Sequence, residues 1–483
     1  SRVSLPGLAI AETKVPSLRS AFPVAVGDPI DADTIKAAQT ELAVAFGDHG
    51  FPFATVEEPI VTIDHETTKG DLEVIIRAGG YRLFGDIVML GASGRVFSAR
   101  HLSRIARFDR GDVYQASDVE DLRRAIVATG LASSVSLEPR EAGDAEHVNI
   151  AVDLSRAPPR TIAGELGYGT GEGARAEVSW QHRNLFPPEG ALTVRALVGT
   201  KEQAAGLLFR RNNFLRRDNI LSAALSARHQ NLDAFEAKTI TLSGSLERQT
   251  NVLYQKKWTW SIGGELTASR ETDFSEATGT ETQRDYLIVA VPGAVTHDTT
   301  DDLLNPTDGF RLGVRLSPEV ARQNGVFTYV RAQVDGSIYF PVSDSVVLAS
   351  RARLGSIVGG ASADRIAPSR RFYAGGGASV RGYGYQAIGP RDPDNDPLGG
   401  KSLAEFSLEA RIRFGSFGVV PFFDAGNIAR GLLPDLGDLR YGAGIGVRYY
   451  TGFGPIRVDV GTPLNRQPGD SHIAVCVSLG QAF

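Results

Sequence analysis

Hydrophobic and polar residues alternate one by one along most of the chain after residue 160. Ile456, Val458 and Val460 share one face of such a segment. Arg457, Asp459 and Gly461 share the other. The same alternation runs from Thr328 to Phe340. A period of two residues indicates a β-strand with one apolar face, so we predict a strand for each of these segments.

Sixteen segments of this kind follow residue 160. They begin near Ile162, Ala174, Ala191, Ala204, Ile220, Ala237, Trp258, Asp285, Phe310, Phe327, Val346, Leu403, Val419, Leu439, Pro455 and His472. An even number of antiparallel strands closes a barrel without leaving an unpaired edge. The alternative is a large soluble β-sandwich with its polar face in water. The barrel is favoured because sixteen long strands in series, with a short connection at every second junction, are hard to fit into a sandwich.

The connections alternate in length along this region. Those after even-numbered strands are short, as at residues 184–190, 341–345, 415–418 and 451–454. The longest, about residues 359–402, follows the eleventh predicted strand. Outer-membrane barrels have short periplasmic turns and long outer loops, so this parity predicts that the long connection faces outside.

Helical and strand patterns are mixed before the stiff Pro158-Pro159 pair. Residues 82–155 have the order β-α-α-β-β, with helices predicted at Ser98–Phe108 and Ser117–Ala128. Ser117 and Glu120 have capping-box spacing at the start of the second helix. The first copy of this order has a helix at Asp33–Phe46 but no convincing opening strand. We therefore predict an internal repeat whose first copy is incomplete at its N-terminus.

Composition narrows the class of protein. Gly accounts for 54 of 483 residues, which suits many tight turns and small inward-facing positions. The formal net charge of −5 is not that of a nucleic-acid binder. Cys476 is the one cysteine, so no intramolecular disulfide is possible. No apolar stretch is long enough for a transmembrane helix.

The long connection carries the most informative stretch, Arg371-Phe-Tyr-Ala-Gly-Gly-Gly-Ala-Ser-Val-Arg-Gly-Tyr-Gly-Tyr385. It resembles the signature of the sixth extracellular loop in the insertase superfamily that includes BamA, TamA and the two-partner secretion transporters. The core of the signature is Val380-Arg381-Gly382-Tyr383, and the preceding residues look most like the TamA branch. The resemblance implies a loop that folds back into the barrel lumen, where its arginine meets acidic residues of the inner wall.

The partners that the resemblance implies are present in the sequence. Phe422-Phe-Asp424-Ala-Gly426 fits the Phe-x-Asp-x-Gly motif of the thirteenth strand, and Ser407-Leu-Glu409 fits the acidic position of the twelfth. The resemblance therefore implies a cluster of Arg381, Asp424 and Glu409. A guanidinium suits carboxylates chemically. Inner-wall charges in a narrow lumen should be screened less than surface charges, but because the lumen is wet we expect this cluster to contribute less stability than a dry buried pair. We call this fastening of the loop by Arg381, Asp424 and Glu409 the latch. The alternative is a loop that merely plugs the pore.

The resemblance covers nearly the whole chain. Its expected fold is mainly β: a 16-stranded antiparallel transmembrane β-barrel at residues 160–483, preceded by β-α-α-β-β POTRA domains at residues 1–80 and 81–157. The terminal strand ends Leu479-Gly-Gln-Ala-Phe483. Gln481 departs from a strict assembly signal, which would have an apolar residue there. Gly480 would let the strand bend inward and weaken its closure against the first strand, although a harmless glycine is the alternative.

No pattern of residues indicates an enzyme, a cofactor or a metal site. Gly442, Gly444 and Gly446 recur every second residue without the following helix that a dinucleotide loop requires. We expect an insertase of the bacterial outer membrane, with its POTRA domains in the periplasm, that assists the assembly of proteins such as autotransporters. The family implies a periplasm-spanning TamB-like partner. Alternatives are a two-partner-secretion channel for unfolded protein, BamA itself, and a passive porin that would leave the repeats unexplained.

Overall fold

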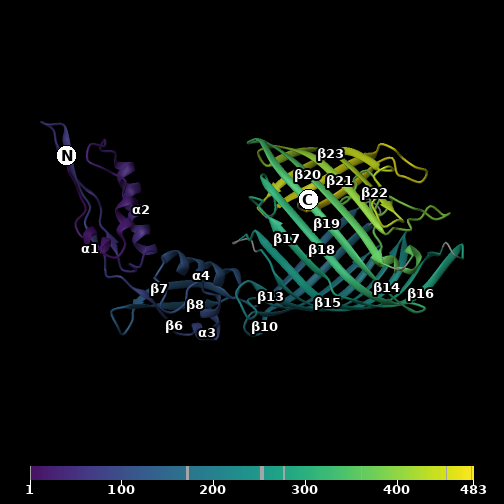
Figure 1. Cartoon of the computed structure of the whole chain (residues 1–483), viewed down its shortest axis with the longest axis horizontal. Coiled ribbons are helices and arrows are strands. Elements are labelled where there is room, and N and C mark those ends of the chain that lie inside the picture. Colours follow the sequence, from purple (N-terminus) through teal and green to yellow (C-terminus); the bar gives the residue numbers. More distant parts are fainter. Residues whose placement is uncertain are drawn as a thin grey trace. The chain divides into compact units, whose positions relative to one another are not determined.

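The structure is a computed structural model. It describes residues 2–169, 173–250, 255–275, 278–359, 362–452, 454–479 and 481–483. The chain forms two compact units, Ser1–Pro159 with Leu215–Arg217 and Arg160–Phe214 with Asp218–Phe483. Within the described ranges, every helix is too short or too polar to cross a bilayer. Figure 1 labels the elements along the chain.

The first unit contains two copies of one small α/β domain. The first copy consists of β1 (Arg2–Ser4), α1 (Leu8–Glu12), the 3-10 turn η1 (Pro16–Ala21), α2 (Ala32–Asp48), β2 (Thr55–Val56), β3 (Ile60–Asp64), β4 (Lys69–Glu73) and β5 (Ile76–Arg77). Its main sheet has the order β1-β4-β3, and β1 runs parallel to β4. The prediction that this copy lacks an opening strand is therefore wrong. The strand is only three residues long, too short for its alternation to be visible in the sequence.

The second copy consists of β6 (Leu83–Met89), the 3-10 turn η2 (Ser93–Arg95), α3 (Ala99–Ile105), α4 (Ala116–Ala128), β7 (Ala132–Glu141) and β8 (His147–Arg156). Both helices were predicted, and β8 lies between β6 and β7 in the sheet. Its core joins Phe84, Leu102, Leu122 and Val148, all fully buried. Burial of these side chains against the sheet stabilises the copy, because the hydrophobic effect scales with apolar area removed from water.

The capping of α4 differs from the prediction. Its N-cap residue is Gln115, which forms no side-chain cap, and Ser117 lies inside the helix. The backbone N–H of Ser117 instead donates to Asp48 Oδ1 at 2.8 Å, and Asp48 belongs to the end of α2 in the first copy. Glu120, the other half of the predicted capping box, pairs with Arg123 at 2.6 Å. One copy of the repeat therefore supplies the cap for a helix of the other.

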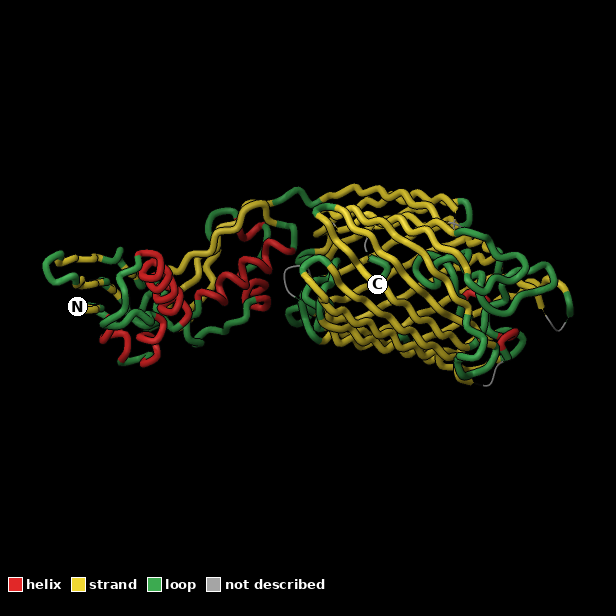
Figure 2. The backbone as a smooth tube through the Cα atoms, turned by 90° about the horizontal axis from the view of Figure 1, so that it is seen from above, coloured by secondary structure: helices red, strands yellow, loops and turns green. Residues whose placement is uncertain are grey.

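The second unit is a closed antiparallel barrel (Figure 2). Its strands are β9 (Arg160–Gly169), β10 (Gly173–Phe186), β11 (Gly190–Gly199), β12 (Glu202–Arg211), β13 (Asn219–Leu232), β14 (Phe235–Arg248), β15 (Trp258–Ser275), β16 (Thr280–Ala290), β17 (Gly293–Asp298), β18 (Gly309–Arg322), β19 (Val326–Ser343), β20 (Val346–Gly359), β21 (Ser402–Phe414), β22 (Phe417–Ala429), β23 (Arg440–Thr451), β24 (Gly454–Pro463) and β25 (Ala474–Leu479). Apart from β16 and β17, which both pair with β15 and β18, each strand pairs with its neighbours in sequence, and β25 returns to β9.

Two of these segments form one position in the wall. Both β16 and β17 lie between β15 and β18, and residues 291–292 separate them. Pro292 cannot donate to a strand ladder, which accounts for the interruption. With β16 and β17 counted together, the wall has sixteen strands, and the predicted 16-stranded antiparallel barrel is confirmed.

The faces of the barrel invert the usual arrangement of a globular protein. On β24, Ile456, Val458 and Val460 are exposed on the outer surface, whereas Arg457 and Asp459 are buried inside. The same division recurs around the wall, as the alternation in the sequence predicted. An apolar outer band with a polar interior is typical of barrels in outer membranes.

The long connection between β20 and β21 folds into the barrel. It contains the 3-10 turns η3 (Ala363–Arg365) and η4 (Pro368–Arg370). Ile366, Phe372, Tyr383 and Ile388 of this connection pack in one buried cluster with side chains of the wall, including Tyr286, Tyr329 and Ile357. The connection therefore fills part of the lumen with its own apolar core.

Candidate functional site

Two glycines let the long connection approach the wall at Arg381. Gly382 has φ +104°, and a Cβ there would lie 2.8 Å from the backbone carbonyl carbon of Thr462 on β24. A Cβ at Gly442 on β23 would lie 2.0 Å from the carbonyl oxygen of Arg381. Only glycine tolerates both the positive φ and this close backbone approach. These residues place the Arg381 side chain against β21, β22 and β24.

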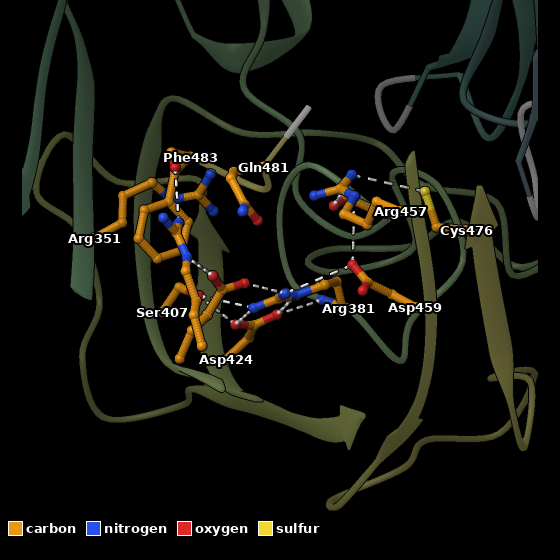
Figure 3. A network of polar contacts seen from close by, with 12 residues as sticks. Arg351, Arg381, Ser407, Asp424, Arg457, Asp459, Cys476, Gln481 and Phe483 are labelled. Atoms are coloured by element: carbon orange, nitrogen blue, oxygen red, sulfur yellow. Dashed lines mark hydrogen bonds and ion pairs between the residues drawn. The ribbon is translucent and has the colours of Figure 1, made fainter. Parts of the chain in front are cut away.

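Arg381 and its implied partners Asp424 and Glu409 lie together in the structure. Figure 3 shows Arg381 beside Asp424 and Ser407. Its Nε and Nη2 donate to the two carboxylate oxygens of Asp424 at 2.7 and 2.8 Å. Its Nη1 donates to Glu409 Oε1 at 2.5 Å, and Nη2 also reaches Ser407 Oγ at 3.0 Å. The Arg381 backbone N–H adds a bond to Asp424 Oδ2 at 2.9 Å. A bidentate guanidinium–carboxylate pair is both strong and directional.

The side chains of this cluster are almost completely buried. Arg381 is 3% exposed, and Glu409 and Asp424 are 1% and 0% exposed. The guanidinium carbon lies 3.7 Å from the centre of the Phe422 ring, so the motif phenylalanine covers one face of the cation. This burial fits the expectation that the charges are screened less than surface charges, but it does not fit the expectation that water in the lumen surrounds them. The inward-folded connection and the wall together cover the cluster from solvent.

The remaining residues of the predicted motifs also lie where the long connection meets the barrel wall. Val380 is fully buried, and a Cβ at Gly426 would lie 2.7 Å from Val380 Cγ2, so the motif glycine provides its space. Tyr383 donates from Oη to Asn465 Oδ1 at 2.9 Å. The structure thus brings Val380, Arg381, Gly382 and Tyr383 against strands β21 to β24.

Charged residues that the sequence analysis did not select extend the cluster. Asp459 on β24 lies 3.6 Å from Arg381 Nη1 and accepts from Arg448 Nη1 at 2.5 Å. Arg411 donates from Nε to Glu409 Oε2 at 3.1 Å. Arg457 lies 3.5 Å from Asp459. The alternation placed these side chains on the inner face, but it could not show which of them meet.

A second group of contacts fastens the start of the connection between β20 and β21 to β15. Arg371 pairs with Asp273 of β15 at 2.9 Å, with both side chains buried. The backbone N–H of Ser369 donates to Glu271 Oε2 at 2.9 Å. Arg370 pairs with Glu265. The connection is therefore fastened to two parts of the wall, at β15 and at β21 to β24. The resemblance implied only the second of these.

The barrel is weakly closed between its last and first strands. Within the described residues, β25 and β9 pair only at Cys476 with Gly169 and at Val477 with Tyr168. By comparison, β9 and β10 pair continuously over ten residues, from 160 to 169 of β9. The predicted bend at Gly480 lies outside the described residues. Phe483 lies inside the barrel, where Arg411 Nη2 donates to its main-chain oxygen at 3.0 Å.

Together these features define a class of barrel protein: the outer face is apolar, a buried arginine fastens a loop in the lumen, and the seam is short. Two family models match the chain and agree with this description. The Omp85 superfamily domain matches residues 168–483, and the chain belongs to the Omp85 superfamily. A POTRA model, described as a surface antigen variable number repeat, matches residues 5–79.

Similar proteins include two outer membrane protein assembly factors, both BamA. The protein of Neorickettsia risticii is 24% identical over 376 residues, which cover 74% of this chain and 50% of that protein. The protein of Nitratidesulfovibrio vulgaris is 22% identical over 474 residues, covering 93% of this chain and 57% of that protein. The chain spans about half the length of these curated relatives.

Solved structures share the fold. BamA from Haemophilus ducreyi lacking POTRA domains 1–3 superposes with a TM-score of 0.78 at 16% identity, covering 98% of this chain and 97% of that one. CdiB from Acinetobacter baumannii gives a TM-score of 0.53 at 13% identity, covering 100% and 89%. At these identities the likeness concerns the fold alone.

Proposed function

We propose that the protein is an insertase of the bacterial outer membrane that helps other outer-membrane proteins, autotransporters among them, to fold into the bilayer. The observation that carries this proposal is the short seam. A strand edge that is paired at only two positions within the described residues offers backbone donors and acceptors to an incoming strand. In this process no covalent bond is made or broken.

The latch has a defined part in this mechanism. Arg381, Asp424 and Glu409 fasten the long connection to β21 and β22, which lie near the β25 side of the seam. The wall beside the seam therefore stays ordered through buried ion pairs while β25 itself is free to move relative to β9. Arg381 is thus a positioning residue for the seam in this proposal.

The finer assignment follows from the loop signature. The run Gly-Gly-x-x-Ser-Val-Arg-Gly-Tyr ending at Tyr383 supports the TamA branch of the superfamily. That branch implies POTRA domains in the periplasm and a periplasm-spanning TamB-like partner. The outward apolar band of the barrel supports a bilayer location.

Reconstitution into liposomes tests the proposal. The full-length protein is mixed with an unfolded autotransporter barrel, and client insertion is scored by protease protection. We expect faster insertion than in empty or porin-containing liposomes. Equal rates with a protein confirmed as folded would reject the insertase assignment.

A disulfide across the seam tests the mechanism within the same assay. Cys476 is paired with Gly169, and paired antiparallel residues have the Cα spacing that a disulfide requires. Gly169→Cys should therefore lock the seam on oxidation, slow insertion to the rate of empty liposomes, and recover on reduction. A lock between Ser226→Cys and Thr241→Cys, paired in β13 and β14, is the matched control in a Cys476→Ser background. Equal insertion by locked and reduced protein would reject the seam as the site of action.

A transporter that exports unfolded protein is the second candidate. Its support is a cavity of about 1300 Å³ between the seam strands and the inward loop, bordered by Tyr168, Tyr385 and Arg457. The CdiB structures share the fold. Release of a client to the far side of the liposome, without insertion, would favour this candidate.

A further inference from the structure

The outer face of the barrel carries two arginines at the end where β9 begins. Exposed Leu207 on β12 pairs with exposed Leu225 on β13, which in turn pairs with exposed Leu242 on β14. Directly paired residues point to the same face of a sheet, so these three leucines mark the apolar outer face. Arg211 and Arg248 follow Leu207 and Leu242 by an even number of residues in uninterrupted ladders, and they therefore share that face.

The two arginines lie on either side of β13. Arg211 pairs with Leu221, and Arg248 pairs with Asn219. Their backbones are thus two strand spacings apart, about 10 Å, and are offset by two residues along the strands. Arginine side chains are long enough to meet at one group that lies over Asn219. We call Arg211, Asn219 and Arg248 the rim site.

The guanidinium groups of the rim site have no carboxylate partner among the residues that the structure describes. Two acidic residues next to the site along the chain are engaged elsewhere. Glu247 points to the opposite face, towards the lumen, and accepts from Gln249 Nε2 at 2.8 Å. Asp218 pairs with Lys256 at 3.1 Å. The rim site therefore presents two positive charges on the outer face that these acidic residues do not neutralise.

Aromatic side chains on both sides place the rim site at the level of lipid headgroups. Phe209 lies on the outer face two residues before the first arginine, and its ring is 5.5 Å from that of Phe186 on β10. On the other side, Trp260 of β15 pairs with Arg248, and Trp258 is exposed. Aromatic residues form girdles on such barrels where hydrocarbon meets the headgroups. The two guanidinium groups thus lie where lipid phosphates are found.

Other strands differ from β12 and β14 at the same end of the barrel. Their outer-face residues there are aromatic and exposed, with Phe310 on β18, Phe340 on β19 and Phe414 on β21. An aromatic girdle alone suits a bilayer of any headgroup charge. The arginines of the rim site add a preference for negative charge at one place on the wall.

We propose that the rim site binds the headgroup of an anionic phospholipid, with Arg211 and Arg248 contacting its phosphodiester group. The guanidinium fork matches the geometry of phosphate oxygens. A lipid is favoured over an acidic protein because both side chains lie on the lipid-facing side of the wall and within the aromatic girdle. The inference goes beyond the proposed function, since it concerns a lipid bound to the barrel and involves no client.

Tryptophan quenching in mixed lipid vesicles tests the inference on the purified full chain. The tryptophans of the chain are Trp180, Trp258 and Trp260, so a Trp180→Phe background leaves the two on β15 as reporters. Quenching by brominated phosphatidylglycerol is compared with quenching by brominated phosphatidylcholine. We expect phosphatidylglycerol to bind more tightly beside these reporters. Arg211→Gln and Arg248→Gln should each lower the ratio of the two binding constants about fivefold.

Arg211→Lys and Arg248→Lys are the matched variants, because they keep the charge and should keep most of the preference. Arg270→Gln removes an outer-face arginine at the far end of β15 and should leave the ratio unchanged. A ratio that neither Gln variant lowers, or that Arg270→Gln lowers as much, would overturn the rim site. Loss of the preference in sodium phosphate, but not in sodium chloride of equal ionic strength, would mean that the site takes free phosphate and would overturn the lipid assignment.

Discussion

Removing the Arg381 side chain tests how much the buried latch stabilises the barrel. In Arg381→Ala, Asp424 keeps two donors, the Ser407 hydroxyl at 2.5 Å and the backbone N–H of residue 381 at 2.9 Å. Glu409 keeps Arg411 at 3.1 Å. Breaking a buried ion pair from one side costs about 3–5 kcal/mol. Because both carboxylates retain partners, we expect a loss of about 3 kcal/mol, the lower end of that range.

The free energy of unfolding would be measured by urea titration of the protein in lipid vesicles, followed by tryptophan fluorescence. Arg270→Ala is the control, since its pair with Asp285 at 2.8 Å is exposed to solvent and should contribute little to the free energy of unfolding. Adding Glu409→Gln and Asp424→Asn to Arg381→Ala should recover part of the loss, because no unpaired charge then remains. A loss no larger than that of the control, or no recovery in the triple variant, would refute the role of buried charge.

Three further predictions concern the loop and the repeat. Gly382→Ala should lower the free energy of unfolding by more than about 1 kcal/mol in the same titration. Residue 382 has a positive φ, and a Cβ there would collide with the backbone of Thr462. An unchanged urea midpoint would contradict this prediction. Asp48→Ala should cost about 1 kcal/mol in hydrogen-exchange protection at the start of α4, where Ser117 loses its acceptor; protection equal to wild type would exclude this cap. The side-chain hydroxyl and the backbone N–H of Thr34 both donate hydrogen bonds to Asp31. These bonds keep the pKa of Asp31 below its ordinary value. That contribution is present above the ordinary pKa of about 4 and is lost as pH falls through the lower folded pKa. The protection factors of the amides in the first turn of α2, which are corrected for the intrinsic pH dependence of exchange, should therefore be lower at pH 3 than at pH 6. Asp31→Ala should abolish the difference, and a difference that persists in the variant would assign it to another group.

The barrel was predictable because lipid and lumen impose opposite demands on alternate residues. In residues 456–461, for example, apolar residues alternate one by one with charged residues or glycine. Strand β1 was missed for the converse reason. Three residues at the edge of a small sheet, with Arg2 and Ser4 among them, carry no periodic signal. Local pattern identifies an element only when the element is long enough for the pattern to repeat.

The site was predictable in part. The motif residues around Arg381 and Asp424 lie together in the structure, and the resemblance implied that pairing. The acceptors of Arg371 and Ser369 on β15 were not found, because inward-facing acidic residues occur on many strands and the sequence does not show which of them a loop will reach. The nearly complete burial of the cluster was missed as well, since it depends on how the whole connection packs.

The cap that Asp48 provides has a consequence for the repeat as a building unit. Helix α4 of the second copy begins on a carboxylate that belongs to the first copy. The two copies therefore do not behave as interchangeable modules. A second copy transplanted alone, or joined behind an unrelated domain, would begin α4 with an unmet backbone donor unless its new neighbour supplied a carboxylate at the same place. Shuffling of such repeats is constrained by the joint between copies as much as by the cores within them.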